Sequence, residues 1–342
     1  MKNPTQKDVA RLAGVSRATV SYVINGKDSK GIPISDETRQ KVLTAVQKLG
    51  YVVNAGAQAL RSGDTKTIGV MLPIYENPYF WKIFNGVSTA ANEAGYNVLL
   101  ANSVFDQERT NQTITELSEQ RIDGLLLLVE FASLPKHVMD QLYKSRHPIV
   151  EGSSSESSKF DLILLNYSDG MRAIMSHLFD LGHRHIIYLH GVQASTTQGQ
   201  DRLSAFREAF IHANLPFDPK WIHYCGQTIE EGYQKALDIL QQPNRPTAIV
   251  AINDLLGMAT IRAAADLGLN VPGDLSIASF DDITFAKFSV PRLTTIATSP
   301  EQNGRDAVRL LLKRLEDPQR QREIIRADWQ LHIRESTGRV PD

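Results

Sequence analysis

The sequence contains little of what marks a secreted, membrane-bound or nucleotide-using protein. Its 342 residues include one cysteine, Cys225, which excludes an internal disulfide framework and fits a reducing compartment. The opening stretch MKNPTQKDVARLAG has no apolar run suited to a signal peptide or membrane span, so we expect a cytoplasmic protein with no membrane partner. No glycine-rich loop of the GxGxxG or GxxxxGK type follows an expected strand, so no cofactor is expected.

Side-chain sets for catalysis or metal binding are also missing from the pattern. Asp281 and Asp282 are direct sequence neighbours rather than a separated acid–base pair, and no Ser/His/Asp set stands out. His183 and His185 form a His-x-His pair that would suit a metal, but no third ligand accompanies them at a metal-binding spacing. We therefore expect a binding protein, with no metal, rather than an enzyme.

Charge is distributed unevenly along the chain. The net charge is −1, yet residues 1–62 carry ten Lys and Arg against four Asp and Glu, a net charge of +6, which leaves −7 for the rest. A basic head on a larger acidic body is typical of a protein whose head alone binds a polyanion. A merely solvated basic face is the simpler alternative.

The first sixty residues have the pattern of a helix-turn-helix followed by a third helix. Thr5 to Asp8 resembles a capping box, Gly14 suits the positive φ of a tight turn, and Ser16 is expected to cap a second helix from Arg17 to about Asn25. A third helix is expected from Ser35 to Leu49, ended by Gly50. The expected core consists of Val9, Leu12, Ala13, Val15, Val20, Ile24, Val42, Leu43, Val46 and Leu49.

Beyond residue 66 the pattern changes to short apolar strands separated by helix-length polar segments. The first series is TIGVMLP, NVLLANS, DGLLLLV and HPIVEG, and the second is DLILLN, HIIYLHG, WIHYCG, TAIVAIN and DLSIASF. Such runs are typical of buried parallel strands, and two series of similar length predict two Rossmann-like lobes. Asn77 and Pro78 are expected to cap and open a helix that runs to Gly95.

The string DVARLAGVSRATVSYVINGK, continued by ISDETRQKVLTAVQKLGYVVNAGAQALRSG, resembles the head of the lactose-repressor (LacI/GalR) family of bacterial regulators. The resemblance extends through NPYFWKIFNGV, DLGHRHIIYLHG, AINDLLGMATIRAAADLGLNVPGDLSIASFDD, PRLTTI and HIREST, and so covers essentially the whole chain. It implies an α/β protein with a three-helix helix-turn-helix head, a hinge helix and a two-lobed core like the type I periplasmic sugar-binding proteins.

The same resemblance implies the domain organisation. The head would comprise residues 1–53, the hinge helix and linker 54–66, and the core 67–342. An N-lobe of about 67–165 and 298–326 and a C-lobe of about 166–297 and 327–342 would be joined by three crossings, near Asn166, near Thr295 to Thr298 and near Ala327.

By this resemblance the second helix enters the major groove of a double-stranded DNA operator. Arg17 is the candidate base reader, because an arginine fork bonds O6 and N7 of guanine; a phosphate clamp is the alternative. Ala18 would offer a methyl contact, and Tyr22 replaces an arginine that many family members carry. The other candidates are Thr5 and, for phosphates, Ser16, Thr19, Ser21 and Asn25.

Residues 54–61 would form the hinge helix, which the resemblance implies folds on the operator. Leu60 would wedge into the minor groove, with Ala57 against the groove floor and Arg61 beside it, and Asn54 completes this set of candidates. Such a short helix is marginal alone, and Gly56 weakens it further, so a plain linker is the alternative.

Matching positions also imply an effector site between the lobes. The candidates are Tyr79, Phe80, Ser153, Arg202, Asn253 and Asp281, a neutral set suited to the hydroxyls of a sugar; a nucleobase stacked on Phe80 is the second possibility. Ser153 stands where family members often have Asp. Singly, Phe80 also fits a core position, Asp281 a helix cap and Arg202 a surface ion pair.

These expectations describe a ligand-controlled transcription regulator, more often a repressor in this family, that acts as a homodimer on a palindromic operator. Two hinge helices must pair on the DNA, and the chain lacks a heptad tail that would favour a tetramer. A solute-binding protein without DNA function is the remaining alternative.

Overall fold

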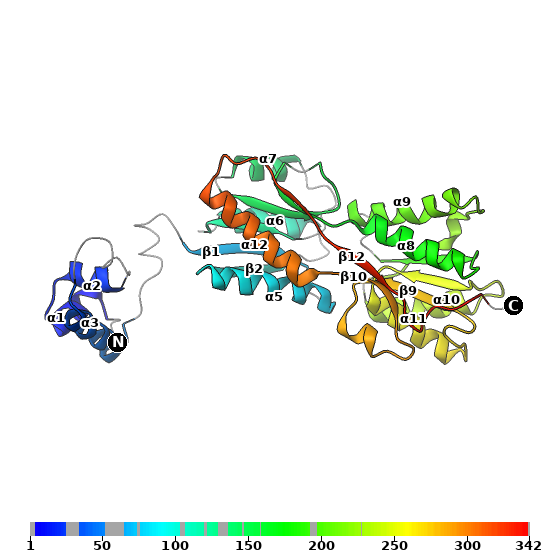
Figure 1. The fold of residues 1–342 in the computed structure, drawn as a ribbon, viewed down its shortest axis with the longest axis horizontal. Helices are drawn as coiled ribbons and strands as arrows, with labels where there is room; N and C mark the ends of the chain where they lie inside the picture. Colours follow the sequence, from blue (N-terminus) through cyan, green and yellow to red (C-terminus); the bar gives the residue numbers. More distant parts are fainter. Residues whose placement is uncertain are drawn as a thin grey trace. The chain divides into compact units, whose positions relative to one another are not determined.

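The computed structural model describes residues 4–24, 34–51, 65–73, 76–102, 107–119, 122–128, 136–145, 147–157, 159–191, 197–226 and 228–340. The chain divides into two compact units, Met1–Thr65 (the head) and Lys66–Asp342 (the core) (Figure 1). Five DNA-binding candidates lie outside the described residues: Asn25, Asn54, Ala57, Leu60 and Arg61.

The head contains three helices in the predicted order, α1 (Gln6–Ala13), α2 (Arg17–Ile24) and α3 (Asp36–Leu49). Gly14 has a φ of 67° in the turn between α1 and α2, the conformation that glycine adopts freely. Ser35 caps α3, because its hydroxyl accepts a hydrogen bond of 3.2 Å from the amide of Thr38. These local signals were readable in the sequence, and the three predicted helices are confirmed.

The packed face of the head differs from the predicted one. Leu12 and Leu43, both expected in the core, are 51 % and 45 % exposed, whereas Ala10 and Ala45 are buried. At about 100° of rotation per residue, the packed face of α1 is centred between Val9 and Ala10, about 110° from Leu12, and Leu43 lies about 100° from Val42. The complete core consists of Val9, Ala10, Val20, Val23, Val42 and Ala45, with Ala13, Val15, Ile24, Ile34, Val46, Leu49 and Tyr51 packed against it.

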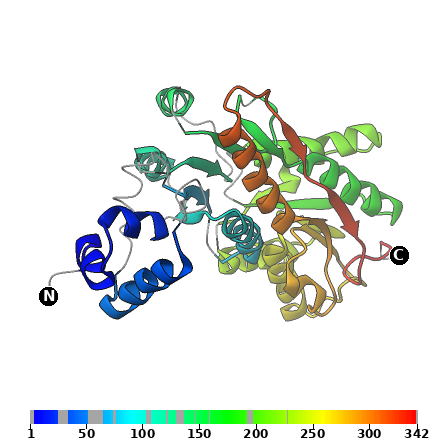
Figure 2. The same ribbon diagram turned by 60° about the vertical axis from the view of Figure 1, so that its left-hand side comes forward.

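The core contains two six-stranded sheets, each covered by helices on both faces (Figures 1 and 2). The first sheet has the order β11-β5-β4-β3-β1-β2, and its strands are β1 (Thr67–Leu72), β2 (Asn97–Asn102), β3 (Gly124–Leu127), β4 (Ile149–Ser153), β5 (Asp161–Leu164) and β11 (Ile324–Arg326). Its helices are α5 (Pro78–Glu93), α6 (Gln107–Glu119), α7 (Lys136–Lys144) and α12 (Pro300–Glu316).

The second sheet has the order β12-β10-β9-β8-β6-β7. Its strands are β6 (Ile186–His190), β7 (Ile222–Tyr224), β8 (Ala248–Ala251), β9 (Ser276–Phe280), β10 (Thr294–Thr298) and β12 (Trp329–His332). The helical segments are α8 (Tyr167–Asp180), α9 (Thr197–His212), η3 (Pro219–Trp221), α10 (Ile229–Leu240), α11 (Asp254–Asp266) and η4 (Thr284–Lys287). We call the half with the first sheet the N-lobe and the half with the second the C-lobe.

Three chain segments connect the lobes. The chain leaves β5 for α8, returns from β10 to α12, and leaves β11 for β12. The last two segments, orange and red in Figure 1, lie side by side, because β12 pairs antiparallel with β10. All other pairs are parallel, so the carboxyl ends of the N-lobe strands and the segments between the lobes lie at one end of the sheet.

Two strands predicted as buried are exposed edges. In β2 the side chain of Leu99 is exposed, and in β7 that of Tyr224 is exposed. Each of these strands has a neighbour on one side only, so half of its surface lacks the cover that central strands such as β1 and β8 receive. An apolar run in the sequence does not distinguish these two positions in a sheet.

Helices α5 and α12 pack with their backbones unusually close. A Cβ atom added at Gly86 would lie 1.9 Å from the carbonyl oxygen of Glu301, and one at Gly304 would lie 2.3 Å from that of Ile83. Only glycine permits this approach, which fixes α12 against α5 on the N-lobe. No helix in the described residues is long and apolar enough to span a membrane.

Candidate functional site

In the head, α2 presents an exposed polar surface. Arg17 and Ala18 are exposed, and Thr19, Ser21 and Tyr22 are partly exposed. Ser16 caps the helix, since its Oγ accepts a hydrogen bond of 3.0 Å from the amide of Thr19 and lies 2.9 Å from the Thr19 hydroxyl. The first turn of α2 is therefore held in place while the Arg17 guanidinium extends into solvent.

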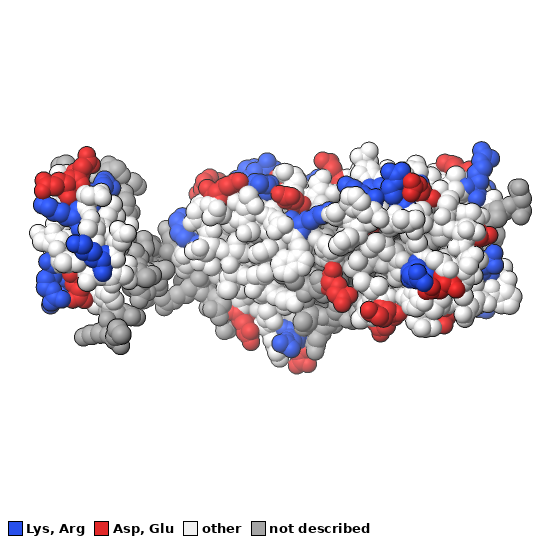
Figure 3. Space-filling model, turned by 90° about the horizontal axis from the view of Figure 1, so that it is seen from below, with Lys and Arg blue, Asp and Glu red and all other residues white. Residues whose placement is uncertain are grey.

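Thr5 is engaged at the start of α1. The Asp8 carboxylate accepts hydrogen bonds from the Thr5 amide at 3.0 Å and the Thr5 hydroxyl at 2.7 Å, and it forms an ion pair of 2.8 Å with Arg11. A carboxylate at this end of the helix also complements the helix dipole. Figure 3 shows Lys and Arg side chains on the surface of the head, interspersed with Asp and Glu.

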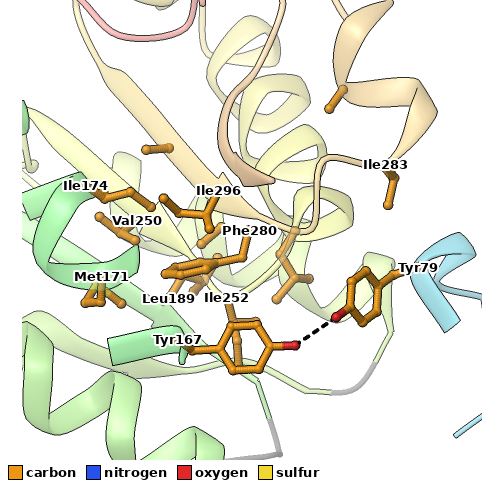
Figure 4. Close-up of a cluster of buried hydrophobic side chains, with 14 of the residues drawn as sticks. Tyr79, Tyr167, Met171, Ile174, Leu189, Val250, Ile252, Phe280, Ile283 and Ile296 are labelled. Atoms are coloured by element: carbon orange, nitrogen blue, oxygen red, sulfur yellow. Dashed lines mark hydrogen bonds between the residues drawn. The ribbon is translucent and has the colours of Figure 1, made fainter. Parts of the chain in front are cut away.

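In the core, two hydrogen bonds join the first turn of α5 to the C-lobe. The Asn77 amide Nδ2 donates to Asp281 Oδ2 at 2.7 Å, and the hydroxyls of Tyr79 and Tyr167 lie 3.1 Å apart. Figure 4 shows Tyr79 and Tyr167 pointing toward one another, with Tyr167 beside Phe280. The Thr298 hydroxyl, on a segment that connects the lobes, lies 3.4 Å from the same Tyr79 oxygen. Polar side chains of both lobes therefore meet at these residues.

Arg202 on α9 lies in this region and is only 3 % exposed. Its guanidinium carbon lies 4.5 Å from the ring centre of Tyr167 and 5.5 Å from that of Phe280, within cation–π range. Burial and the charge of Arg202 lower the pKa of His190, at the end of β6, to about 4, so this imidazole is neutral near pH 7. The alternative of a surface ion pair for Arg202 is wrong, because the side chain is buried against aromatic rings.

Asp281 and Asp282 both have positive φ, 107° and 46°, which is uncommon outside glycine and occurs where surrounding contacts hold the backbone. The Asp281 amide donates to the carbonyl of Ile296 at 2.9 Å. The Asp282 carboxylate contacts Arg334 at 2.5 Å and His332 at 3.2 Å. Burial alone would raise the pKa of Asp282, but the bond with Arg334 and the nearby positive charges hold it below its ordinary value.

Asp254, which the sequence did not single out, is the first residue of α11, and its fully buried carboxylate contacts β9 and β10. Its carboxylate accepts hydrogen bonds from the hydroxyls of Ser279 (2.5 Å) and Thr295 (2.6 Å) and from the amide of Ile283 (2.7 Å). Burial raises the pKa of Asp254 to about 6 despite these three donors. Asp254 accepts a hydrogen bond from Thr295 of β10, the strand that returns the chain to the N-lobe, and so helps to fix the position of that strand.

Three predicted effector residues are engaged in local structure. Ser153 Oγ accepts from the amide of Ser155 at 3.2 Å, and Asn253 caps α11 by accepting from the amide of Leu256 at 2.9 Å. Phe80 packs against the main apolar cluster, with its ring centre 5.3 Å from that of Tyr79. The structure thus brings Tyr79, Arg202 and Asp281 together, and it places the side chains of Ser153 and Asn253 in turns.

The His-x-His pair of the C-lobe has a structural environment. His183 is buried, with Nδ1 3.0 Å from the Thr247 hydroxyl and Nε2 2.9 Å from both the Ser276 hydroxyl and the Gly338 carbonyl. Both ring nitrogens therefore have partners, and Nε2 connects the C-terminal segment at Gly338 to β9 at Ser276. The described residues contain no group of three or more His, Cys, Asp or Glu able to hold a metal ion.

Four residues that join the lobes were missed by sequence reasoning as site residues: Asn77, Tyr167, Ser154 and Asp201. Ser154, just after β4, donates from Oγ to Asp201 Oδ2 on α9 at 2.5 Å. The partners of these bonds are 204, 88 and 47 residues apart in the chain, so no local pattern could have paired them. Asn77 gave one signal, its position as the cap of α5, where its Oδ1 accepts from the amide of Tyr79 at 3.0 Å.

Two family models match this chain. Residues 5–54 match the model described as bacterial regulatory proteins, lacI family, and residues 175–337 match the periplasmic binding protein-like domain. Among curated relatives, the HTH-type transcriptional repressor PurR of Histophilus somni (strain 129Pt) is 35 % identical over 97 % of this chain and 98 % of its own length. The ribose operon repressor of Haemophilus influenzae is 34 % identical over 92 % of this chain and 92 % of its own.

Solved structures show the same relationship over both units. The Lac repressor dimer bound to operator and the anti-inducer ONPF superimposes with a TM-score of 0.86 at 26 % identity, covering 98 % of this chain and 100 % of that one. A complex of the transcriptional regulator CelR with cellobiose gives a TM-score of 0.70 at 30 % identity, covering 97 % of this chain and 99 % of that one.

Proposed function

The chain belongs to the lacI family of bacterial regulatory proteins, and we propose that it is a transcriptional repressor that a small molecule controls by binding between the lobes of the core. The observation that carries this proposal is the match to known repressors along both units, head and core together. A solute-binding protein would need the core alone. In this proposal the protein acts by binding DNA and a small molecule and catalyses no reaction.

The proposed DNA contact is made by α2 in the major groove of a palindromic operator. Arg17 is exposed on a turn fixed by Ser16, so its guanidinium is free to reach a guanine edge. Thr5, Ala18, Thr19, Ser21 and Tyr22 complete the proposed contact surface among the described residues. The basic surface of the head supplies sequence-independent attraction to phosphates.

The proposed effector site lies where Tyr79, Arg202 and Asp281 meet Asn77 and Tyr167. A carboxylate, an amide, two phenol hydroxyls and a buried guanidinium provide hydrogen-bond donors and acceptors together with aromatic faces, a composition that suits sugars. The names of two similar proteins refer to ribose and to cellobiose, which supports a carbohydrate effector. A nucleobase is the alternative effector, and the binding test below includes it.

A ligand that binds one arrangement of the lobes better than another shifts the population toward that arrangement. The bonds Asn77–Asp281 and Tyr79–Tyr167 connect the lobes directly, so a ligand that inserts among these groups changes their relative position. We propose that this change is transmitted along the connecting segments to the first strand, β1, which follows the hinge region in the chain. The effector thereby controls operator affinity from a separate site.

A homodimer is proposed as the DNA-binding form, since a palindrome presents two equal half-sites. The core exposes apolar side chains that a partner subunit would cover: Phe288 is 77 % exposed, Val290 is 90 % exposed, and Phe285 and Trp81 are also exposed. Figure 3 shows a broad uncharged area on the face of the core seen from below, the side on which α5 lies in Figure 1. Clusters of exposed apolar side chains such as Phe285, Phe288 and Val290 mark contact surfaces.

The proposed function is tested by operator binding. Full-length protein should bind a palindromic DNA fragment, selected from random sequence, with higher affinity than unrelated DNA, and protein lacking residues 1–62 should not. Addition of the correct effector from a panel of sugars and nucleobases should change the operator affinity of the full-length protein. Equal affinity for every DNA sequence would reject the repressor assignment.

The dimer is tested separately by sedimentation of a charged variant. Phe288→Glu should produce monomers and weaken operator binding, while Ile211→Glu, at an equally exposed apolar residue on α9, should sediment as the wild type. A dimer that survives Phe288→Glu would place the subunit contact elsewhere.

A further inference from the structure

One hydrogen bond between the lobes lies beside the proposed effector site yet involves none of its predicted residues. Ser154 stands just after β4 in the N-lobe, and its Oγ donates to Asp201 Oδ2 on α9 of the C-lobe at 2.5 Å. A hydrogen bond from a hydroxyl to a carboxylate is charge-assisted and stronger than one between neutral groups. The pair therefore holds a charged group of one lobe against a neutral donor of the other.

Asp201 is connected on both sides to the proposed effector residues. It directly precedes Arg202, whose guanidinium stacks over Tyr167. Its backbone carbonyl accepts from the hydroxyl of Ser168, the residue after Tyr167, at 3.5 Å. The hydroxyl of Tyr167 in turn meets that of Tyr79. Asp201 is thus one residue, or one hydrogen bond, away from groups that the effector is proposed to contact.

The Asp201 carboxylate retains unused capacity for hydrogen bonds. An ionised carboxylate accepts through about four lone-pair positions. Within the described part of the chain, the one hydrogen bond to this carboxylate comes from Ser154, on Oδ2. Asp201 and Ser154 are both only partly buried, so a small molecule can approach them.

Asp281 and Asn77 repeat the same arrangement. The C-lobe supplies a carboxylate, Asp281, and the N-lobe supplies a neutral donor, the Asn77 amide, at 2.7 Å. A molecule that enters between the lobes has to satisfy C-lobe carboxylates that neutral N-lobe donors now satisfy. Hydroxyl groups do so, whereas a phosphate or carboxylate placed directly against Asp201 or Asp281, rather than against Arg202, would be repelled.

We propose that Asp201 is a specificity-determining residue of the effector site, whose carboxylate binds a hydroxyl of the effector in the place that the Ser154 hydroxyl occupies in this structure. The effector is accordingly an uncharged polyhydroxyl compound. This inference rests on the proposed function, because it assigns a ligand group to the same site. Ser154 acts as a competitor for Asp201 that the ligand displaces.

Two substitutions give effects of opposite sign. Asp201→Asn removes the charge with little change in volume and should weaken binding of the effector by about tenfold or more, since hydrogen bonds to charged groups exceed neutral ones in strength. Ser154→Ala removes the competing donor and should strengthen binding by about fivefold, the equivalent of about 1 kcal/mol. Ser154→Thr keeps the hydroxyl and should bind as the wild type.

The experiment is calorimetric titration of the full-length protein and the three variants with D-ribose and with cellobiose. D-ribose 5-phosphate and adenine serve as charged and nucleobase comparisons. We expect at least one neutral sugar to bind the wild type. Asp201→Asn should weaken the binding of that sugar and Ser154→Ala should strengthen it. D-ribose 5-phosphate should bind more weakly than D-ribose. Tryptophan fluorescence of each variant checks that the core remains folded.

Several results would overturn the role of Asp201. Unchanged affinity of Asp201→Asn for the sugar would do so. Weaker binding of the sugar by Ser154→Ala would also do so, because it would mean that the bond between Ser154 and Asp201 stabilises the ligand-bound form. Binding of adenine but neither sugar, or of no compound, would reject the polyhydroxyl effector. Operator binding is measured in parallel with and without each ligand: its absence in the wild type under every condition refutes the repressor assignment, whereas its presence with unchanged variants refutes only the role of Asp201.

Discussion

In the head, most of the described side chains proposed to bind DNA lie on the surface of α2, and the hydrogen bonds of Thr5 and Ser16 stay within one helical turn. In the core, the corresponding side chains are mostly buried and bonded across the lobes, as in Asn77–Asp281 and Tyr79–Tyr167. A surface residue of the head can therefore change without disturbing the fold. A residue in the core cannot lose a partner without leaving another polar group unsatisfied. The two units should accordingly respond to mutation in different ways.

The largest effect is expected when a side chain is added where the backbones of α5 and α12 are in contact. In Gly86→Ala the new Cβ would lie 1.9 Å from the Glu301 carbonyl oxygen, so one helix must move. We expect the core to lose about 3 kcal/mol or more of its free energy of unfolding. All three tryptophans, Trp81, Trp221 and Trp329, belong to the core, so their fluorescence during urea unfolding reports on this unit alone.

The head should be unaffected by Gly86→Ala, which hydrogen exchange would show as unchanged protection of the amides of α1 to α3. Thr89→Ala, at an exposed position on the same helix, serves as the control and should change stability by less than about 0.5 kcal/mol. Equal effects of the two substitutions would mean that α5 and α12 do not make the close contact described above.

A second difference is the response to pH, since all nine histidines belong to the core. Burial and Arg202 lower the pKa of His190 from 6.5 to about 4, so between these values the unfolded chain binds more protons than the folded chain. The free energy of unfolding should therefore fall as the pH falls through this range. His190→Phe keeps the ring between Tyr188 and Tyr224 and removes this dependence.

Relative to wild type, His190→Phe should gain about 2 to 3 kcal/mol on going from pH 7 to about pH 4.5. Asp254, with a pKa raised to about 6, affects the free energy of unfolding in the opposite direction over the same pH range. Because Asp254 is present in both proteins, the difference between wild type and His190→Phe at each pH removes its contribution. Urea unfolding followed by tryptophan fluorescence at each pH gives the difference. His212→Phe, at an exposed position on α9, is the control, and an identical gain there would contradict the assignment to His190.

In the head the largest effect should be on DNA binding rather than folding. Arg17→Ala should weaken binding to the preferred operator by about 2 kcal/mol, or about thirtyfold, at constant salt concentration. Arg11→Ala removes an equally exposed arginine that is paired with Asp8, and it should have a smaller effect. Fluorescence anisotropy with labelled operator and with unrelated DNA measures both.

Arg17→Lys separates the two interpretations of Arg17. Lysine keeps the charge but lacks the planar fork, so a base reader loses discrimination between operator and unrelated DNA while a phosphate clamp retains it. Wild-type discrimination in Arg17→Lys would show that Arg17 binds phosphate.

How much the sequence predicts also differs between the two units. The three helices of the head were predictable because their signals are local: the left-handed turn after α1 favours glycine, found at Gly14, and Ser16 and Ser35 are caps. The fold class of the core was predictable because two series of strands and helices alternate. The exposed Leu12 and Leu43 were not, since one residue of displacement around a helix changes which side chain faces the core.

The least predictable part is the set of contacts between the lobes. Ser154 and Asp201 are 47 residues apart, and Asn77 and Asp281 are 204 apart. The chain crosses from β5 to α8 between the two members of each pair, so the contacts form only when both lobes are folded. Candidates chosen by position within a motif, such as Ser153 and Asn253, are in this structure engaged in local turns, whereas the neighbouring Ser154 makes the contact across the lobes.

The smallest predicted effect tests whether the two units fold independently. Ser35→Ala removes the hydroxyl that accepts from the Thr38 amide, and should cost the head about 1 kcal/mol of stability. Ser35→Asp supplies another capping oxygen and should restore it. Because the cap serves α3 alone, the urea midpoint reported by the three core tryptophans should stay at its wild-type value while the protection of α1 to α3 against hydrogen exchange falls. A shift of both signals together would show that head and core unfold as one unit, and would remove the basis for treating substitutions in the head as separate from the fold of the core.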